Sequence, residues 1–255
     1  MFGQTPGATW NFESPAHTEA LSRLLYVAEQ GEPFVLLVGD RGTGKTTLLR
    51  QVQSECSRFG HSAVLINVAA LDDASFLWHL CGGLSIALRG EQSRTEMLAA
   101  IRDEIAGRAL CQHETVVILD DLHRAAEDLS PLIQFLSALN GQTEGAVSVV
   151  AAAEPAPAMT CTTQSALRVE LNPLSDAESK QFASGLLQSK QIPSTRITSE
   201  ALDSIADFGQ GSPARLARLC EMLKVAVSTT PDLRITADVV EVLTEETLMS
   251  TETAW

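Results

Sequence analysis

Lys45 and Thr46 end a glycine-rich segment whose backbone and side chains could bind a polyphosphate. Residues 39–46 read GDRGTGKT and match the pattern G-x-x-x-x-G-K-[ST] at every fixed position. Glycines allow a tight turn in which successive backbone N–H groups converge on an anion, because glycine has no Cβ. In this pattern the lysine ammonium reaches the β- and γ-phosphates and the threonine hydroxyl binds Mg²⁺. The segment therefore predicts a nucleotide site.

The elements around the segment are those that such a site needs. An apolar run, residues 34–38, leads into it, and a helix beginning near Lys45 would direct its positive dipole end at the phosphates. The alternative, a glycine-rich turn that merely joins two elements, does not require a lysine and a threonine at these positions. The predicted nucleotide contacts in this segment are Gly39, Asp40, Arg41, Gly42, Thr43, Gly44, Lys45, Thr46 and Thr47.

Two adjacent aspartates predict the metal end of the same site. Asp120 and Asp121 follow the apolar run 115–119, which is typical of a strand covered on both faces, and together they form a Walker B pattern. Ligands of open α/β sheets bind beyond the carboxyl ends of the strands, so both carboxylates should emerge beside the phosphate loop. We expect Asp120 to hold Mg²⁺ together with Thr46, and Asp121 to orient or deprotonate the attacking water. The alternative is an aspartate pair in a helix-capping turn.

The rest of the chain alternates buried strands with helices and then becomes wholly helical. The strands are predicted at residues 34–38, 63–68, 115–119, 147–152 and 168–171. The helices between them are predicted at 16–30, 45–59, 74–89, 93–111 and 129–139, and the later ones at 175–190, 198–208, 213–228 and 236–248. This order predicts an α/β fold, in which a doubly wound parallel sheet forms a P-loop NTPase core and an all-helical lid domain follows.

The expected domain boundaries follow from the same change of pattern. We place a P-loop α/β ATPase domain at 1–173, with a loop segment at 1–15, a helical lid domain at 174–249, and a polar tail at 250–255. Ser175 with Glu178 forms a capping box at the first lid helix, whereas Thr198 lacks the matching glutamate three residues later.

Composition limits the classes of partner. The 255 residues carry 32 acidic and 18 basic side chains, a formal net charge of −14, which disfavours strong binding of DNA through its phosphate backbone. The five cysteines are scattered and odd in number, as expected of free thiols in a reducing compartment rather than of a zinc site or disulfide framework. The amino terminus has neither a basic nor an apolar targeting region, and no apolar stretch is long enough to span a membrane. We expect a cytoplasmic chain without membrane contact.

The chain resembles the AAA+ ATPases, and within them two related groups. These are the ExeA/GspA-type ATPases of bacterial secretion and pilus systems and the TniB/TnsC/MuB-type ATPases of transposition. The likeness covers nearly the whole chain, although only the two phosphate-site motifs are individually specific. It implies ATP with Mg²⁺ as the cofactor and assembly with copies of the same chain. Besides those motifs it rests on His17, Glu19, Ala20, Leu21 and Phe34, on Asn172-Pro173-Leu174-Ser175, and on Gly211-Ser212-Pro213.

The resemblance also implies roles for single residues. Relatives place a neutral polar residue that senses the γ-phosphate after the strand that follows Walker B, and here that position holds Glu154. Because a carboxylate near a phosphate is repelled unless it is protonated or turned away, a solvated loop glutamate is an equal alternative. The second Walker B carboxylate is commonly glutamate, so the shorter Asp121 implies slow hydrolysis.

Two arginines are the remaining matches. The lid arginine of relatives follows a Gly-x-Pro stretch directly, whereas Arg215 stands one position later, and solvation of one helix face by Arg215 and Arg218 is the alternative. The arginine that relatives extend to a neighbouring subunit's γ-phosphate aligns with Gln164, so Arg168 is the nearest substitute. An ordinary surface charge explains Arg168 equally well.

These expectations favour an AAA+ ATPase that binds Mg-ATP, hydrolyses it slowly, and assembles as a switch acting on a protein client of a secretion or cell-envelope system. A DNA-associated transposition-type regulator that recruits a recombinase is the alternative. A third possibility is a nucleotide-binding signalling module with little turnover, as suggested by Asp121, Glu154 and Ala214.

Overall fold

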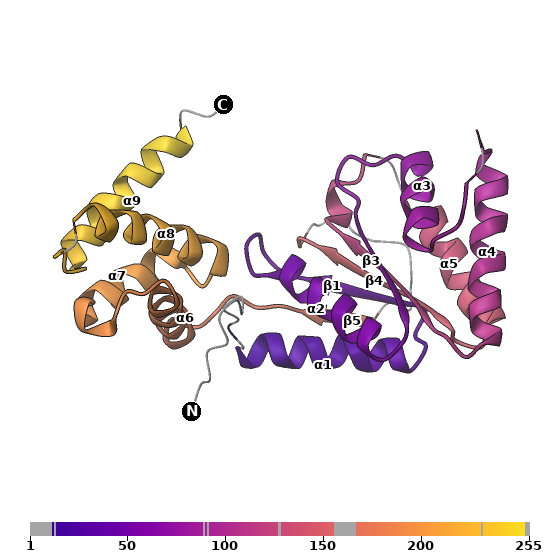
Figure 1. Ribbon diagram of the computed structural model, residues 1–255, viewed down its shortest axis with the longest axis horizontal. Coiled ribbons are helices and arrows are strands. Elements are labelled where there is room, and N and C mark those ends of the chain that lie inside the picture. Colours follow the sequence, from indigo (N-terminus) through magenta and orange to yellow (C-terminus); the bar gives the residue numbers. More distant parts are fainter. Residues whose placement is uncertain are drawn as a thin grey trace. The chain divides into compact units, whose positions relative to one another are not determined.

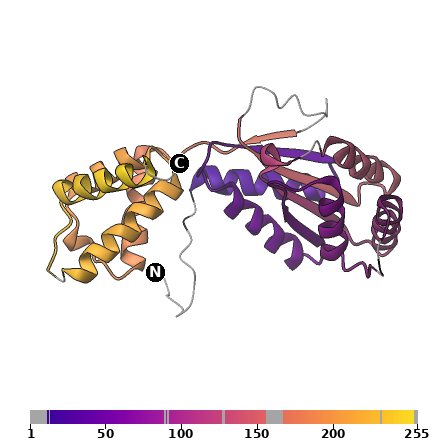
Figure 2. The same ribbon diagram turned by 90° about the horizontal axis from the view of Figure 1, so that it is seen from above.

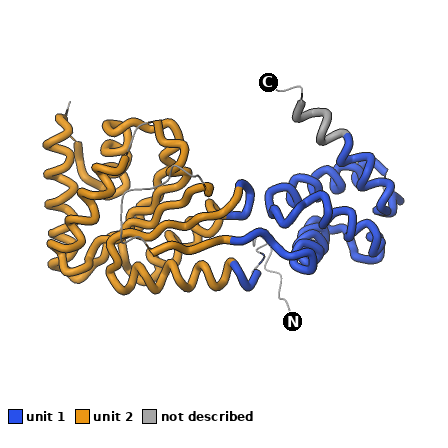
Figure 3. Tube along the Cα trace, turned by 180° about the vertical axis from the view of Figure 1, so that it is seen from behind, with its two compact units in different colours: residues 1–16, 41–44, 172–255 blue, residues 17–40, 45–171 orange. Residues whose placement is uncertain are grey.

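The structure, a computed structural model, describes residues 12, 14–88, 90, 92–126, 129–155, 167–230 and 232–252. The chain divides into two compact units (Figure 3). The sheet unit comprises residues 17–40 and 45–171, and the helical unit comprises residues 1–16, 41–44 and 172–255. The tip of the glycine-rich loop therefore groups with the carboxyl-terminal residues. The division into an ATPase domain at 1–173 and a lid at 174–249 stays a prediction.

A five-stranded parallel sheet organises the sheet unit (Figures 1 and 2), with strand order β2-β3-β4-β1-β5. The strands are β1 (Phe34–Val38), β2 (Ser62–Asn67), β3 (Thr115–Asp120), β4 (Val147–Ala153) and β5 (Leu167–Glu170). Every residue of β3 and of β4 is buried, as expected of parallel strands covered on both faces. The order places the end of β4 between the ends of β3 and β1, so the segments that follow these three strands emerge side by side.

Helices cover both faces of the sheet. Side chains alternate across a strand, so Val117 and Leu119 of β3 enter one core while Val116 and Ile118 enter the other. The first core is closed by α3 (Asp73–Gly83), α4 (Arg94–Leu110) and α5 (Ser130–Gln142), and the second by α1 (Pro15–Glu29) and α2 (Lys45–Arg58). This arrangement confirms the doubly wound α/β fold predicted from the sequence.

The helical unit packs its carboxyl-terminal helices around a third core that includes Leu187, Ile205 and Leu219. Its elements are α6 (Asp176–Ser189), η2 (Ser194–Arg196), α7 (Ser199–Gly209), α8 (Pro213–Thr229) and α9 (Ala237–Glu252). Phe12 joins this core through an edge-to-face contact with Phe182, with ring centroids 5.3 Å apart. The helical carboxyl-terminal region agrees with the sequence prediction.

The predicted capping box opens α6. The Ser175 hydroxyl accepts the Glu178 N–H at 3.3 Å, and the Glu178 carboxylate accepts the Ser175 N–H at 2.8 Å. At α7 only half of this arrangement forms, since Thr198 accepts the Ala201 N–H at 3.2 Å and alanine cannot reciprocate. Both outcomes match the sequence analysis.

We predict that Ser175→Ala lowers the free energy of unfolding by about 1 kcal/mol, because an N–H at the helix start loses its acceptor. Urea denaturation followed by circular dichroism measures the change. Ser189→Ala is the matched control, since Ser189 ends the same helix and only donates to the Leu186 carbonyl. That control should stay within about 0.5 kcal/mol of the unchanged chain. Equal losses in the two variants would contradict the prediction.

Some element boundaries differ from expectation. The helix predicted at 74–89 ends at Gly83, because two glycines weaken its end and Ser85 takes a left-handed conformation with φ +62°. Gly83 also allows α3 to approach β2, since a Cβ there would lie 2.2 Å from Val64 Cγ1. The last helix continues to Glu252, beyond the expected residue 248, because no glycine or proline interrupts it. Most of the predicted loop segment 1–15 lies outside the described residues.

Within the part of the chain that the structure describes, no helix combines the length and the apolar content that crossing a bilayer requires.

Candidate functional site

The glycine-rich loop leaves the carboxyl end of β1 at the position expected for a phosphate-binding turn. The Gly39 N–H donates to the Ala153 carbonyl at 3.3 Å, which ties the start of the loop to the end of β4. Gly42 and Gly44 adopt φ values of +83° and +100°, which side chains with a Cβ rarely tolerate. Helix α2 then begins at Lys45, and the first N–H groups of a helix lack intrahelical acceptors. The segment thus offers backbone donors toward an anion.

The Lys45 ammonium lies within this loop rather than in solvent. The residue is 7% exposed, and its Nζ donates to the carbonyls of Gly39 at 2.7 Å and Asp40 at 2.9 Å. Burial lowers the pKa of Lys45, and nearby carboxylates partly oppose that shift. The opposing charges, in order of effect, are those of Glu154, Asp120, Asp121 and Asp40. A cation held by two exchangeable carbonyl contacts is suited to a phosphate oxygen.

The two predicted metal ligands contact each other. The Thr46 hydroxyl donates to Asp120 Oδ2 at 2.7 Å, and Asp120 Oδ1 accepts the Asp121 N–H at 3.0 Å. Asp120 is only 2% exposed, so its carboxylate is fixed on both oxygens at the end of β3. A hydroxyl and a carboxylate are the oxygen ligands that Mg²⁺ prefers, and Mg²⁺ commonly completes its shell with water and phosphate. This donor set fits the predicted ion.

Asp121, the predicted water-orienting residue, stands in an uncommon backbone conformation. Its φ of +58° and ψ of +38° are left-handed, a region in which aspartate and asparagine are enriched among residues with side chains. This conformation gives a physical reason for aspartate at this position. Its Oδ2 accepts a hydrogen bond from Asn67 Nδ2 at 3.2 Å, from the end of the neighbouring strand β2.

Glu154 follows β4 directly and contacts a histidine that sequence reasoning did not assign. His123 belongs to η1 (Leu122–Arg124), the short turn after Asp121. Its Nδ1 accepts the Glu154 N–H at 3.3 Å, and its Nε2 lies 3.6 Å from Glu154 Oε1. The two residues are 31 positions apart in the sequence, so their spacing did not indicate that they are in contact. The neighbouring strands β3 and β4 bring them together.

Arg168 lies on β5, the edge strand of the sheet. Its Nε is 3.1 Å from Glu170 Oε1, and the two side chains are 57% and 61% exposed. The guanidinium therefore has an acidic neighbour on its own strand and remains open to solvent. Its predicted role as a residue reaching a neighbouring subunit stays a prediction, and Gln164, the aligned position, lies outside the described residues.

Arg215 belongs to the helical unit. Its guanidinium donates to Gln210 Oε1 at 2.7 Å, and its backbone N–H donates to the Ser212 hydroxyl at 3.4 Å. Within the same unit the Gly42 carbonyl accepts the Ala214 N–H at 3.2 Å and the Ser212 hydroxyl at 3.3 Å. The structure thus shows a polar contact of the loop tip near Arg215, while the nucleotide contact of Arg215 stays a prediction.

The other loop residues divide by exposure. Arg41 and Thr47 are exposed and Thr43 is buried. Their predicted contacts with phosphate stay predictions.

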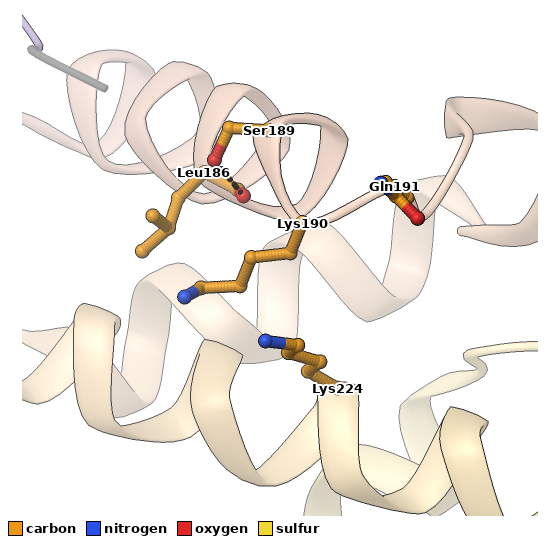
Figure 4. A pocket seen from close by; sticks show the side chains of 5 residues that line it. All are labelled: Leu186, Ser189, Lys190, Gln191 and Lys224. Atoms are coloured by element: carbon orange, nitrogen blue, oxygen red, sulfur yellow. Dashed lines mark hydrogen bonds between the residues drawn. The ribbon is translucent and has the colours of Figure 1, made fainter. Parts of the chain in front are cut away.

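The helical unit contains a hollow of about 510 Å³ (Figure 4). Lys190 and Lys224 extend into it from the end of α6 and from α8. Lys190 also pairs with Glu221 and stands at the carbonyl end of α6, where a positive charge is favourable. These two structural roles explain Lys190, which is the more buried of the two lysines. The residues that line the hollow are Leu186, Ser189, Lys190, Gln191 and Lys224.

Comparisons with known proteins show the family of this chain. A family model described as "AAA domain" (AAA_22) matches residues 28–159, which include the glycine-rich loop and both aspartates. The chain is 23% identical over 233 residues to "General secretion pathway protein A" of Aeromonas hydrophila. That match covers 88% of this chain and 42% of the relative, so the chain spans about two fifths of that protein's length.

Solved structures show the same fold at low identity. The chain is similar to Cdc6p of Pyrobaculum aerophilum, with a TM-score of 0.70, 17% identity, and coverage of 90% of this chain and 66% of that one. It is also similar to the ORC2 protein of Aeropyrum pernix in ADPNP-ADP complexes, with a TM-score of 0.64, 18% identity, and coverage of 95% and 71%. At these identities the likeness concerns the fold alone.

Proposed function

The chain belongs to the AAA_22 family of AAA domains, and from this premise we propose that it is an ATP-dependent switch that assembles with copies of itself and acts on a protein client. The observation that carries the proposal is the group of chemically matched residues at one edge of the parallel sheet. Lys45 lies in the glycine-rich loop, Thr46 donates to Asp120, and Asp121 follows directly. Family membership makes nucleotide binding by such a group the expected chemistry.

Each residue then has a definite task. The loop N–H groups and Lys45 would hold the phosphates, and Thr46 with Asp120 would hold Mg²⁺, which neutralises charge on the phosphates when bound. Asp121 would accept a proton from a water molecule or orient it, and Asn67 keeps its carboxylate in place meanwhile. A short carboxylate in a left-handed turn has little freedom to adjust, which favours slow turnover. Slow turnover suits a switch.

The self-assembly and the client are supported by different observations. Arg168 on the edge strand is solvent-exposed and could reach a second copy of the chain. The match to General secretion pathway protein A, together with the net charge of −14, favours a protein client of a secretion or cell-envelope system in the cytoplasm over DNA.

We predict that Mg-ATP, but not Mg-ADP, increases the mass of the protein in solution. Sedimentation velocity at two protein concentrations, with each nucleotide, measures this change. Arg168→Ala should weaken ATP-dependent assembly, because it removes the charge offered to the neighbouring copy. Arg102→Ala is the matched control, since Arg102 is similarly exposed (53% against 57%) but lies on α4.

An unchanged mass with every nucleotide would contradict self-assembly. Assembly that required duplex DNA, and that weakened steeply between two salt concentrations, would favour the DNA-associated regulator instead.

A further inference from the structure

The His123 imidazole contacts both the backbone and the side chain of Glu154. Its Nδ1 accepts the Glu154 N–H at 3.3 Å, and its Nε2 lies 3.6 Å from Glu154 Oε1. A ring nitrogen that accepts a hydrogen bond carries no proton, so the neutral ring must carry its proton on Nε2. Glu154 Oε1 lies 3.6 Å from that nitrogen, a close polar contact that is longer than a hydrogen bond. The histidine thus holds one residue at two points.

The turn that carries His123 is itself anchored. The Arg124 carbonyl accepts the Ala70 N–H at 2.9 Å, and the Leu71 carbonyl accepts the Ala126 N–H at 3.3 Å. These bonds attach η1 to the segment after β2, on the side of η1 away from β4. The His123 side chain is only 15% exposed. The backbone around His123 is held by the segment after β2. The imidazole can therefore restrain Glu154 at the end of β4, because His123 does not depend on Glu154 for its own position.

The position of the Glu154 carboxylate matters to Lys45. Even with the Glu154 carboxylate beside His123, its charge is the one that most opposes the lowering of the Lys45 pKa by burial. Strand β4 lies between β3 and β1, so Glu154 emerges between Asp120 and the glycine-rich loop. In the structure Lys45 donates to two loop carbonyls while Glu154 engages His123. A carboxylate released from His123 would compete with phosphate for the ammonium and would also repel the phosphate.

We propose that His123 is a positioning residue that holds the Glu154 carboxylate toward η1, which leaves Lys45 available to the terminal phosphate of a nucleoside triphosphate. The proposal rests on the nucleotide binding proposed above and deepens it. It gives the Glu154 carboxylate a partner at the end of β4, the His123 imidazole at 3.6 Å. The effect should concern ATP more than ADP, since only ATP carries a γ-phosphate.

Two substitutions separate this role from a purely structural one. His123→Asn keeps an acceptor at the place of Nδ1 and loses the donor near the carboxylate, whereas His123→Gln keeps a donor at the place of Nε2 and loses the acceptor. We expect His123→Asn to weaken ATP binding about ten-fold, with ADP binding and Tm nearly unchanged. We expect His123→Gln to keep the preference for ATP and to lower Tm by about 2–4 °C.

A second-site substitution tests the mechanism directly. Glu154→Gln removes the competing charge at almost constant shape, so the double variant His123→Asn/Glu154→Gln should recover the ATP affinity of the unchanged chain. Titration calorimetry with Mg-ATP and Mg-ADP gives the affinities, and thermal denaturation without nucleotide gives Tm.

The outcomes distinguish the two proposals. If the unchanged chain binds neither nucleotide, the proposed function is wrong. If it binds ATP and His123→Asn binds ATP equally well, or if the double variant shows no recovery, the positioning role is wrong and the function stands. Parallel losses of ATP and ADP affinity in both single variants would likewise overturn the positioning role.

Discussion

Lys45→Ala is expected to weaken the binding of Mg-ATP by about 100-fold or more. The lysine is buried in the loop, its ammonium is held by the Gly39 and Asp40 carbonyls, and no other basic side chain lies within the 39–46 segment beyond the exposed Arg41. Removing one member of a buried charged contact leaves the other unpaired, which costs about 2–5 kcal/mol. Titration calorimetry or displacement of a fluorescent ATP analogue measures the loss.

Lys224→Ala is the matched control for this prediction, because Lys224 is an exposed lysine on α8 of the helical unit. Its affinity for Mg-ATP should equal that of the unchanged chain. If Lys45→Ala bound ATP as well as the control does, the assignment of the phosphate-binding loop would be wrong.

Asp121→Asn is expected to lower the rate of ATP hydrolysis by about 10²–10³-fold while ATP binding persists, so the chain should accumulate in its ATP-bound state. The substitution removes the carboxylate that would accept or orient a proton. It should not strain the backbone, because asparagine tolerates the left-handed conformation that Asp121 adopts at φ +58°. Single-turnover hydrolysis and a separate binding titration distinguish the chemical step from affinity.

Asp207→Asn, an exposed aspartate on α7, removes the same charge elsewhere and should leave the rate unchanged. Equal rates for Asp121→Asn and this control would leave Asp121 without a role in the chemical step. If the unchanged chain and Asp121→Asn bound ATP equally and neither hydrolysed it, the chain would be a nucleotide-binding module rather than an ATPase.

Local pattern alone predicted most of the fold. The apolar runs that form β3 and β4 are buried on both faces. Continuous apolar runs of this kind indicate a parallel sheet with helices on both sides. The capping box at Ser175 and Glu178 marked the first helix of the helical unit to within one residue. Such features depend on neighbours within a few positions, which a sequence displays directly.

The end of α3 shows what apolar spacing misses. Helix α3 ends at Gly83, where its backbone approaches Val64 of β2 too closely for a side chain. The apolar spacing within this helix contains no information about that approach. The prediction extended the helix to residue 89 although Gly82 and Gly83, which weaken its end, are visible in the sequence.

The sequence by itself determined the chemical inventory of the site: a loop whose glycines tolerate positive φ, a lysine and a threonine at its end, and aspartates after a buried strand. The tertiary structure alone decided which of these groups meet. Asn67 reaches Asp121 because β2 and β3 pair in register, and His123 reaches Glu154 because β4 lies next to β3. Sheet order is set by packing of the whole core, so contacts across strand ends cannot be read from local spacing.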